Sequence, residues 1–335
     1  MTSDALFVPK GFARSRHVQS VLASVGVLAP PASFAPESSE DVFVPLPGGM
    51  GLLARAWWQA HGAARDTLLL VHGVAGSSES RYLLRAAVLG YQAGLHVVRL
   101  NLRGVGEGAT LAPTFYHAGL TEDLHETIAL LSGRSEVARI HLVGFSLGGA
   151  TVLKAATEWA DAPPDRVATV SAVSPPLDLA TASRWNERPA ALPYRWYIVR
   201  KLREMVLAQH ARFPDAIRID VGAAKAARTV WAFDDAIVAP HHGFSGAADY
   251  YACVSPGSRL SSIRVPTLIV HADDDPLVSP ASVIPWLRGA SAAVHFVRTA
   301  HGGHVTFAPR LLGDGLLRSF AMEQVLAGVT LRGSK

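Results

Sequence analysis

Apolar residues along the chain fall into short unbroken runs, separated by longer stretches of helical period. The first such run spans residues 67–72, and a second run with strand character spans residues 95–100. Runs of this length are typical of strands that are buried on both faces of a parallel sheet. Each run is followed by a pattern of helical period, at 81–93 and at 120–131. This alternation predicts a mainly parallel sheet flanked by helices.

The same alternation extends over most of the chain. Further strands are predicted at 139–143, 167–173, 267–271 and 294–297, and a last helix at 311–326. Ahead of the first buried run, residues 41–46 and 50–58 have strand character and are separated by Pro47, Gly48 and Gly49. Proline and glycine at that spacing favour a tight turn, so these residues predict a hairpin.

The alternation stops between residues 178 and 250, where residues 194–207 have helical period. The apolar side chains of this helix are predicted to share one face: Trp196, Val199, Leu202 and Val206. We interpret 179–245 as a helical lid insertion in a single domain of residues 37–335. Packing onto the core is the equal alternative to gating. An apolar face bordered by basic residues also allows peripheral contact with a lipid surface.

Residues 1–36 are predicted to form an arm, with a short helix at 14–28 and then a loop rich in proline and serine. Basic residues precede the apolar stretch 18–35, as they do in a signal peptide. Polar residues interrupt that stretch, and Pro30-Pro31 breaks it. The pattern therefore favours an arm over a signal peptide.

Composition narrows the function classes. The net charge of +4 is small for 335 residues, and no long basic run is present, so nucleic-acid binding is not expected. No stretch approaches about 18 unbroken apolar residues, so no spanning helix is expected. The single cysteine, Cys253, cannot form an internal disulfide. This suits a reducing compartment, and we expect a cytoplasmic protein.

The clearest chemical motif is Gly-Phe-Ser-Leu-Gly at residues 144–148, between the predicted strand 139–143 and a helical pattern at 150–156. Strand, Gly-x-Ser-x-Gly and helix is the context of a nucleophile elbow, which exposes the serine hydroxyl on a sharp turn. Glycines beside the serine let strand and helix approach closely. Ser146 is therefore the candidate nucleophile, with an inert glycine-rich turn as the alternative.

A nucleophilic serine needs a base and an orienting acid, and in folds with this elbow both follow it in the chain. Three aspartates at 273–275 follow one predicted strand and are candidate acids, with a solvated loop as the alternative. His301 and His304 follow the next strand. His304 is the better candidate base, because two glycines directly before it permit a tight loop.

Two further chemical features concern the surroundings of the serine and the use of the histidines. Backbone N–H groups of Val74, in the loop after the first buried strand, and of Leu147, after the serine, are the expected oxyanion donors. A metal pair of His301 and His304, completed by His241-His242, is the alternative use of the histidines. Because the order serine, acid, histidine already accounts for His304, no metal and no other cofactor is expected.

Several motifs together resemble the YheT-like family of α/β-hydrolase fold proteins, which also includes mammalian lipases. They are Arg16-His17-Val18-Gln19-Ser20, Val71-His72-Gly73, Asn101-Leu102-Arg103-Gly104, Gly144-Phe145-Ser146-Leu147-Gly148-Gly149, Phe233-Asp234-Asp235, Asp249-Tyr250-Tyr251, Asp274-Asp275-Pro276 and His301-Gly302-Gly303-His304. The resemblance implies an α/β-hydrolase fold and a triad of Ser146, Asp275 and His304, with Asp274 as the fallback acid. It also implies that the arm belongs to the mature protein.

These observations predict a serine hydrolase that cleaves an acyl ester of short or medium chain length. Transfer of the acyl group to an alcohol is the alternative reaction of the same triad. A binding protein that kept the fold without catalysis is the alternative from another class. The expected partner is a small-molecule acyl ester. The sequence pattern does not distinguish a monomer from an oligomer.

Overall fold

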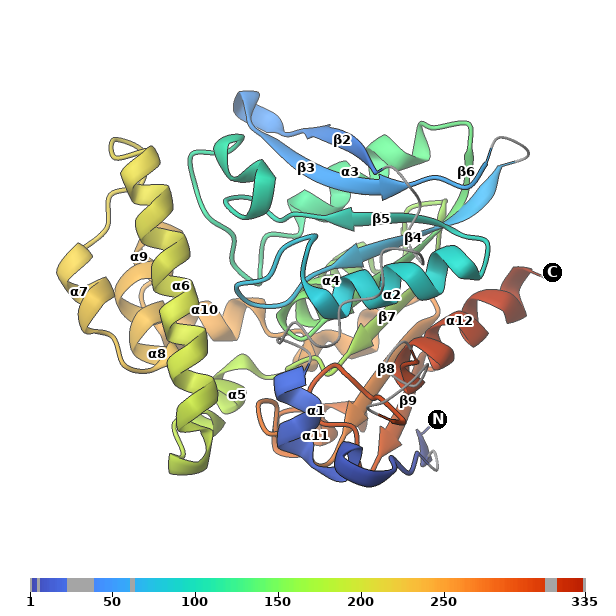
Figure 1. Ribbon diagram of the computed structural model, residues 1–335. Helices are drawn as coiled ribbons and strands as arrows, with labels where there is room; N and C mark the ends of the chain where they lie inside the picture. Colours follow the sequence, from blue (N-terminus) through green and yellow to red (C-terminus); the bar gives the residue numbers. More distant parts are fainter. Residues whose placement is uncertain (1, 5–6, 23–38, 61–63, 311–317, 334–335) are drawn as a thin grey trace.

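The computed structural model describes residues 2–4, 7–22, 39–60, 64–310 and 318–333. Within them, nine strands form one sheet in the order β1-β9-β8-β7-β6-β4-β5-β3-β2 (Figure 1). The strands are β1 (Thr2–Asp4), β2 (Glu40–Pro45), β3 (Gly51–Trp57), β4 (Arg65–Val71), β5 (His96–Leu100), β6 (Val137–Phe145), β7 (Val167–Val173), β8 (Thr267–Ala272) and β9 (Val294–Thr299). The predicted hairpin, β2–β3, is antiparallel and pairs antiparallel with β5, whereas the other neighbours are parallel. The prediction of a mainly parallel sheet is confirmed.

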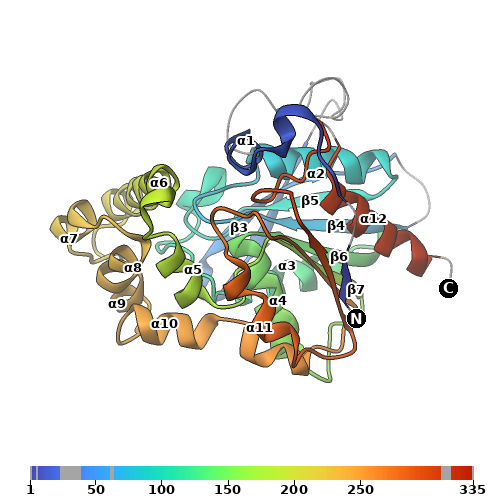
Figure 2. The ribbon, with the colours of Figure 1, turned by 90° about the horizontal axis from the view of Figure 1, so that it is seen from below.

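The central strands are mainly apolar because helices cover both faces of the sheet. In β4, Leu69 and Val71 pack into one core, and Leu68 and Leu70 pack into the other. Helices α3 (Glu122–Ser132), α4 (Leu147–Trp159) and α11 (Ile284–Leu287) line the first core. Helices α2 (Arg81–Gln92) and α12 (Phe320–Gly333) line the second (Figure 2).

The two ends of the chain differ in detail from the predicted helices. The arm has a 3-10 turn at Gly11–Arg14 and a helix α1 (Arg16–Leu22), and the rest of the predicted helix and the loop after it lie outside the described residues. The last helix, α12, spans Phe320–Gly333, and residues 311–317 of the predicted helix lie outside the described residues. Among the described residues, no helix combines the length and apolar character that crossing a bilayer requires.

Between β7 and β8 the described chain is helical. The segment contains α5 (Leu179–Trp185), α6 (Leu192–Arg212), α7 (Val221–Ala226), α8 (Val230–Phe233), a π-helical turn (Asp234–Val238), α9 (Ala239–His241) and α10 (Ala247–Val254). In Figure 1 these helices form the yellow and orange group beside the sheet. Their apolar side chains, which include Val206 and Phe233, form a hydrophobic cluster with residues from elsewhere in the chain, such as Phe115.

One prediction for this segment is wrong. Val199, Leu202 and Val206 are buried on one face of α6, but Trp196 is 62% exposed. Residues three apart differ by about 60° in direction around a helix, so Trp196 lies well away from the mean direction of the other three. Its ring is instead covered by the guanidinium of Arg200, 5.2 Å from the ring centroid. The apolar period of α6 is therefore interrupted at its first turns.

Candidate active site

Ser146 lies at the junction of β6 and α4. Its φ of 53° and ψ of −121° place it in a region that non-glycine residues rarely adopt. The strain is held by a hydrogen bond, because the Ser146 N–H donates to the Val173 carbonyl of β7 at 2.9 Å. The hydroxyl therefore stands at the carboxyl edge of the parallel strands, where α/β proteins bind ligands.

The elbow glycines are required by close backbone approach. A Cβ on Gly144 would overlap the carbonyl of Gly148, and a Cβ on Gly148 would overlap the carbonyl of His72. These contacts join the strand, the helix after it and the neighbouring loop. Any larger residue would separate these backbones, so the glycine spacing in the sequence has a steric cause.

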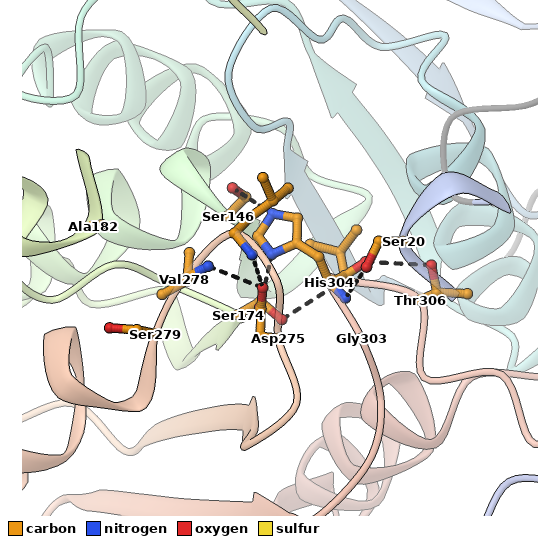
Figure 3. A network of polar contacts seen from close by, with 12 residues as sticks. Ser20, Ser146, Ser174, Ala182, Asp275, Val278, Ser279, Gly303, His304 and Thr306 are labelled. Carbon is orange, nitrogen blue, oxygen red and sulfur yellow. Dashed lines mark hydrogen bonds and ion pairs between the residues drawn. The ribbon is translucent and has the colours of Figure 1, made fainter. Parts of the chain in front are cut away.

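His304 lies between the serine and an aspartate (Figure 3). Its Nε2 is 2.9 Å from Ser146 Oγ, and its Nδ1 is 2.8 Å from Asp275 Oδ2. The Asp275 side chain is fully buried, and its other oxygen accepts the N–H groups of Leu277 and Val278 at 2.8 and 2.9 Å. Because this carboxylate only accepts, Nδ1 of the imidazole carries the proton and Nε2 accepts from the serine hydroxyl.

Asp274 has a different role in the same loop. Its Oδ1 accepts the Gly303 N–H at 2.9 Å, and its Oδ2 lies 3.3 Å from His301 Nδ1. The structure therefore brings Asp275, and not the fallback Asp274, to His304. His301 is half-exposed and contacts Asp274.

Two tyrosines shape the loop that holds Val74. Tyr82 Oη accepts the Gly73 N–H at 2.8 Å, and Tyr116 Oη accepts the Ala75 N–H at 2.6 Å. Among the described residues, the Val74 N–H between them has no acceptor. Sequence reasoning missed both tyrosines, because neither belongs to a motif that signals a role in this loop.

Leu147 and His72 complete the surroundings of the serine. The Leu147 N–H begins α4 and also lacks an acceptor within the described chain, as is usual in a first helical turn. His72 Nδ1 donates to the Gly73 carbonyl at 2.8 Å, and its Nε2 accepts the Leu102 N–H at 3.3 Å. Burial lowers the pKa of His72 to about 4, so this imidazole is neutral at physiological pH. It braces the loop without adding charge.

A family model described as alpha/beta hydrolase fold matches residues 66–310. The chain belongs to this α/β hydrolase family. The putative esterase YheT of Escherichia coli (strain K12) is 31% identical over 312 residues, which cover 91% of this chain and 88% of that protein. The resemblance to YheT-like proteins that the motifs indicated is thus confirmed.

Other relatives of this α/β hydrolase are also named after the hydrolysis of esters. Phospholipase ABHD3 of Mus musculus is 29% identical and covers 73% of this chain, which spans 59% of that protein. Monoacylglycerol lipase of Saccharomyces cerevisiae is 28% identical and covers 72% of this chain, which spans 55% of it. The solved esterase Pf2001 of Pyrococcus furiosus has a TM-score of 0.58 at 16% identity, over 88% of this chain and 91% of that one, which shows a shared fold. The names of these four proteins refer to esterase, lipase or phospholipase activity.

A cavity of about 1040 Å³ opens beside Ser146 of this α/β hydrolase. This is just above the range of roughly 300–1,000 Å³ that is usual for ligand pockets. Its lining is mainly apolar and includes Leu179, Leu192, Ile198, Leu202, Met205 and Val230. Asp234 is a polar exception, 8% exposed, with Oδ2 accepting from Tyr251 Oη at 2.6 Å. Burial raises the pKa of Asp234 to about 7.

The histidines considered for a metal pair have other contacts. His241 stacks on Phe115 at 4.3 Å between ring centroids, and His242 lies 4.3 Å from the ring of His117. Within the described ranges, no group of three or more His, Cys, Asp or Glu side chains has an arrangement that could hold a metal ion. Among the described residues, the four histidines of the metal alternative are therefore not brought together as a set of metal ligands.

Proposed function

We propose that this α/β hydrolase cleaves carboxylic esters through a serine nucleophile and an acyl-enzyme intermediate. The observation that carries the proposal is the hydrogen-bonded series from Asp275 through His304 to Ser146, beside an apolar cavity. The relatives named as esterases and lipases support the same reaction class.

In the proposed reaction, Ser146 Oγ attacks the ester carbonyl while His304 Nε2 takes its proton. Asp275 keeps the imidazole oriented and stabilises its charged form. The N–H groups of Val74 and Leu147 stabilise the oxyanion. Collapse of the tetrahedral intermediate releases the alcohol, which takes the proton from His304. Water then attacks the acyl-serine in the same way and releases the acid.

We propose that the apolar cavity binds the acyl chain of the ester. Its volume of about 1040 Å³ and its apolar lining leave room for an acyl chain of short or medium length. Graded nitrophenyl esters should therefore show a rise in kcat/KM with chain length, followed by a fall once the chain exceeds the cavity. The same reactions with added ethanol separate hydrolysis from acyl transfer, because transfer yields the ethyl ester.

We propose that residues 179–245 act as a lid above Ser146, in a single domain that follows the arm. Support comes from α6, whose side chains form part of the cavity wall. Leu192 and Trp196 also line it and are 53% and 62% exposed, so apolar surface reaches the outside beside the cavity. Such a surface suits contact with lipid, and flotation with liposomes tests this contact. Protein that stays at the bottom of the gradient would refute it.

The decisive test of the nucleophile is covalent labelling with a fluorophosphonate. Wild-type protein should be labelled, and Ser146→Ala should lose both labelling and nearly all ester turnover. Ser135→Ala, a change at an exposed serine in the loop before β6, is the matched control. Labelling that persists in Ser146→Ala would overturn the assignment, and an unlabelled wild-type protein without esterase activity would favour a binding role.

A further inference from the structure

Helix α1 of the arm packs against the loop that holds His304. Residues 16–20 of this helix form one of the motifs that carry the family resemblance. Gln19 and Ser20 are 1% and 6% exposed, which is unusual for polar side chains on a short helix near the chain end. Buried polar groups need hydrogen-bond partners, so these two residues should be bound to something specific.

Ser20 is bound to the main chain of the proposed base. Its hydroxyl accepts the His304 N–H at 3.0 Å and donates to the Arg16 carbonyl at 2.8 Å. Figure 3 shows Ser20 beside His304, on the side away from Ser146. The hydroxyl thus connects the arm helix to the backbone of the residue whose ring contacts the nucleophile.

Gln19 binds the same loop at Thr306 and Ala308, two and four residues after His304. Its Oε1 accepts the Ala308 N–H at 3.0 Å, and its Nε2 donates to the Ala308 carbonyl at 2.8 Å and the Ala13 carbonyl at 2.9 Å. Thr306 Oγ1 donates to the Gln19 carbonyl at 2.7 Å. The amide side chain is therefore fixed from several directions.

The two surfaces also interlock sterically. A Cβ on Gly303 would lie 2.5 Å from Gln19 Cβ and 2.9 Å from the Arg16 carbonyl oxygen. Gly303 also has a φ of 59°, which favours glycine independently of the available space. The residue before His304 thus touches the arm as closely as its backbone allows.

The histidine loop has unfavourable conformations of its own. Val305 and Phe307 have φ values of 59° and 48°, and a β-branched residue rarely adopts such an angle. Strained residues persist when their surroundings over-determine them. The hydrogen bonds from Gln19 and Ser20 help to hold the loop in this conformation.

We propose that Gln19 and Ser20 are positioning residues, which hold the His304 loop so that the imidazole meets both Ser146 and Asp275. This inference rests on the proposed function, since it assigns His304 the role of base. A misplacement of about 1 Å can cost on the order of 100-fold in rate. The arm would then be a working part of the active site, although it touches none of the reacting atoms.

The experiment compares Ser20→Ala, Gln19→Leu and Ser20→Thr with the wild-type protein. We expect kcat to fall about 10-fold for Ser20→Ala and about 100-fold for Gln19→Leu, with KM within about twofold. Ser20→Thr keeps a hydroxyl and should retain most of the activity. Ser15→Ala is the matched control, because its hydroxyl lies in the same arm and accepts the Val18 N–H at 3.4 Å. It should leave kcat unchanged.

Two readouts separate positioning from a loss of folded protein. Active sites are counted by fluorophosphonate titration, so that kcat refers to competent enzyme. Hydrogen exchange of residues 302–308 should quicken in Ser20→Ala and Gln19→Leu and stay at the wild-type rate in Ser15→Ala. Unchanged kcat per titrated site, or equal exchange in all variants, would overturn the inference.

The failure of the proposed function would look different. In that case the wild-type protein and all arm variants would lack both labelling and ester turnover. Quicker exchange of 302–308 in the Ser20 and Gln19 variants would then show that the arm holds the loop, but His304 in that loop would not be a catalytic base. The proposed positioning role would therefore be refuted. Active wild-type protein with active arm variants would remove the inference and leave the proposed function intact.

Discussion

The buried carboxyl of Asp234 provides the sharpest physical test of the cavity. It is 8% exposed, and its one recorded partner among the described residues is the hydroxyl of Tyr251 at 2.6 Å. That hydrogen bond lowers the pKa of Asp234, but burial outweighs it and raises the pKa from 3.8 to about 7. The folded protein therefore binds this proton more tightly than the unfolded chain does.

The sign and size of the effect follow from linkage. Below pH 3.8 both states hold the proton, and above about 7 neither does. Between these values the folded state gains the proton preferentially, so the contribution is complete at low pH and is lost as pH rises towards 7. The rise from 3.8 to about 7 corresponds to about 4 kcal/mol, at about 1.4 kcal/mol per pKa unit.

Asp234→Asn removes this titration, and its side-chain oxygen can still accept from Tyr251. The free energy of unfolding of wild-type protein and variant should be measured in denaturant from pH 4 to pH 8.5. We expect the variant to gain stability relative to the wild type as pH rises, by up to about 4 kcal/mol. Asp215→Asn, a change at an exposed carboxyl of the same segment, controls for charge. A difference between Asp234→Asn and the wild type that is constant across this range would refute the reasoning.

Three other outcomes are expected. Asp275→Asn should lower kcat about 10⁴-fold with little change in KM, because the amide favours the wrong imidazole tautomer. Steady-state kinetics measures this loss, and a fall in kcat of less than about 10-fold would contradict the prediction. Gly148→Ala should abolish soluble expression through backbone overlap, whereas Gly328→Ala, in α12 with open space around it, should stabilise by up to about 1 kcal/mol in thermal unfolding. Tyr116→Phe leaves the Ala75 N–H without its acceptor and should lower kcat about 10-fold, while an unchanged kcat would separate this tyrosine from the oxyanion loop.

The parts of the site that are encoded locally could be predicted from the sequence. The elbow around Ser146 is a short motif whose glycines, Gly144 and Gly148, are dictated by contacts within one turn and its neighbouring loop. The order of serine, acid and histidine follows from strands that end at one edge of the sheet. The choice of Asp275 came from family resemblance, because the spacing alone did not separate it from Asp274.

The remaining parts depend on contacts between segments that are distant in the chain. Tyr116 and Ser20 act on loops 41 and 284 residues away from them, and no local pattern records such pairings. The exposure of Trp196 was missed for a different, local reason. Its direction around α6 lies well away from the mean direction of Val199, Leu202 and Val206, so it does not share their buried face.

Backbone strain at the site is shared between neighbouring loops. The described non-glycine residues with positive φ are Ala75, Ser146, Ala160, Ser174, Val305 and Phe307, and only Ala160 lies outside the loops at the site. Each such residue costs on the order of 1–3 kcal/mol in isolation. Ser146 N–H binds the Val173 carbonyl, Ser174 N–H binds the Val270 carbonyl, and Val305 N–H binds Ser174 Oγ. Because the loop of the nucleophile and the loop of the histidine are linked through the end of β7, a shift in either strains the other. The separation of Ser146 and His304 is thereby fixed by the sheet and not by their side chains alone.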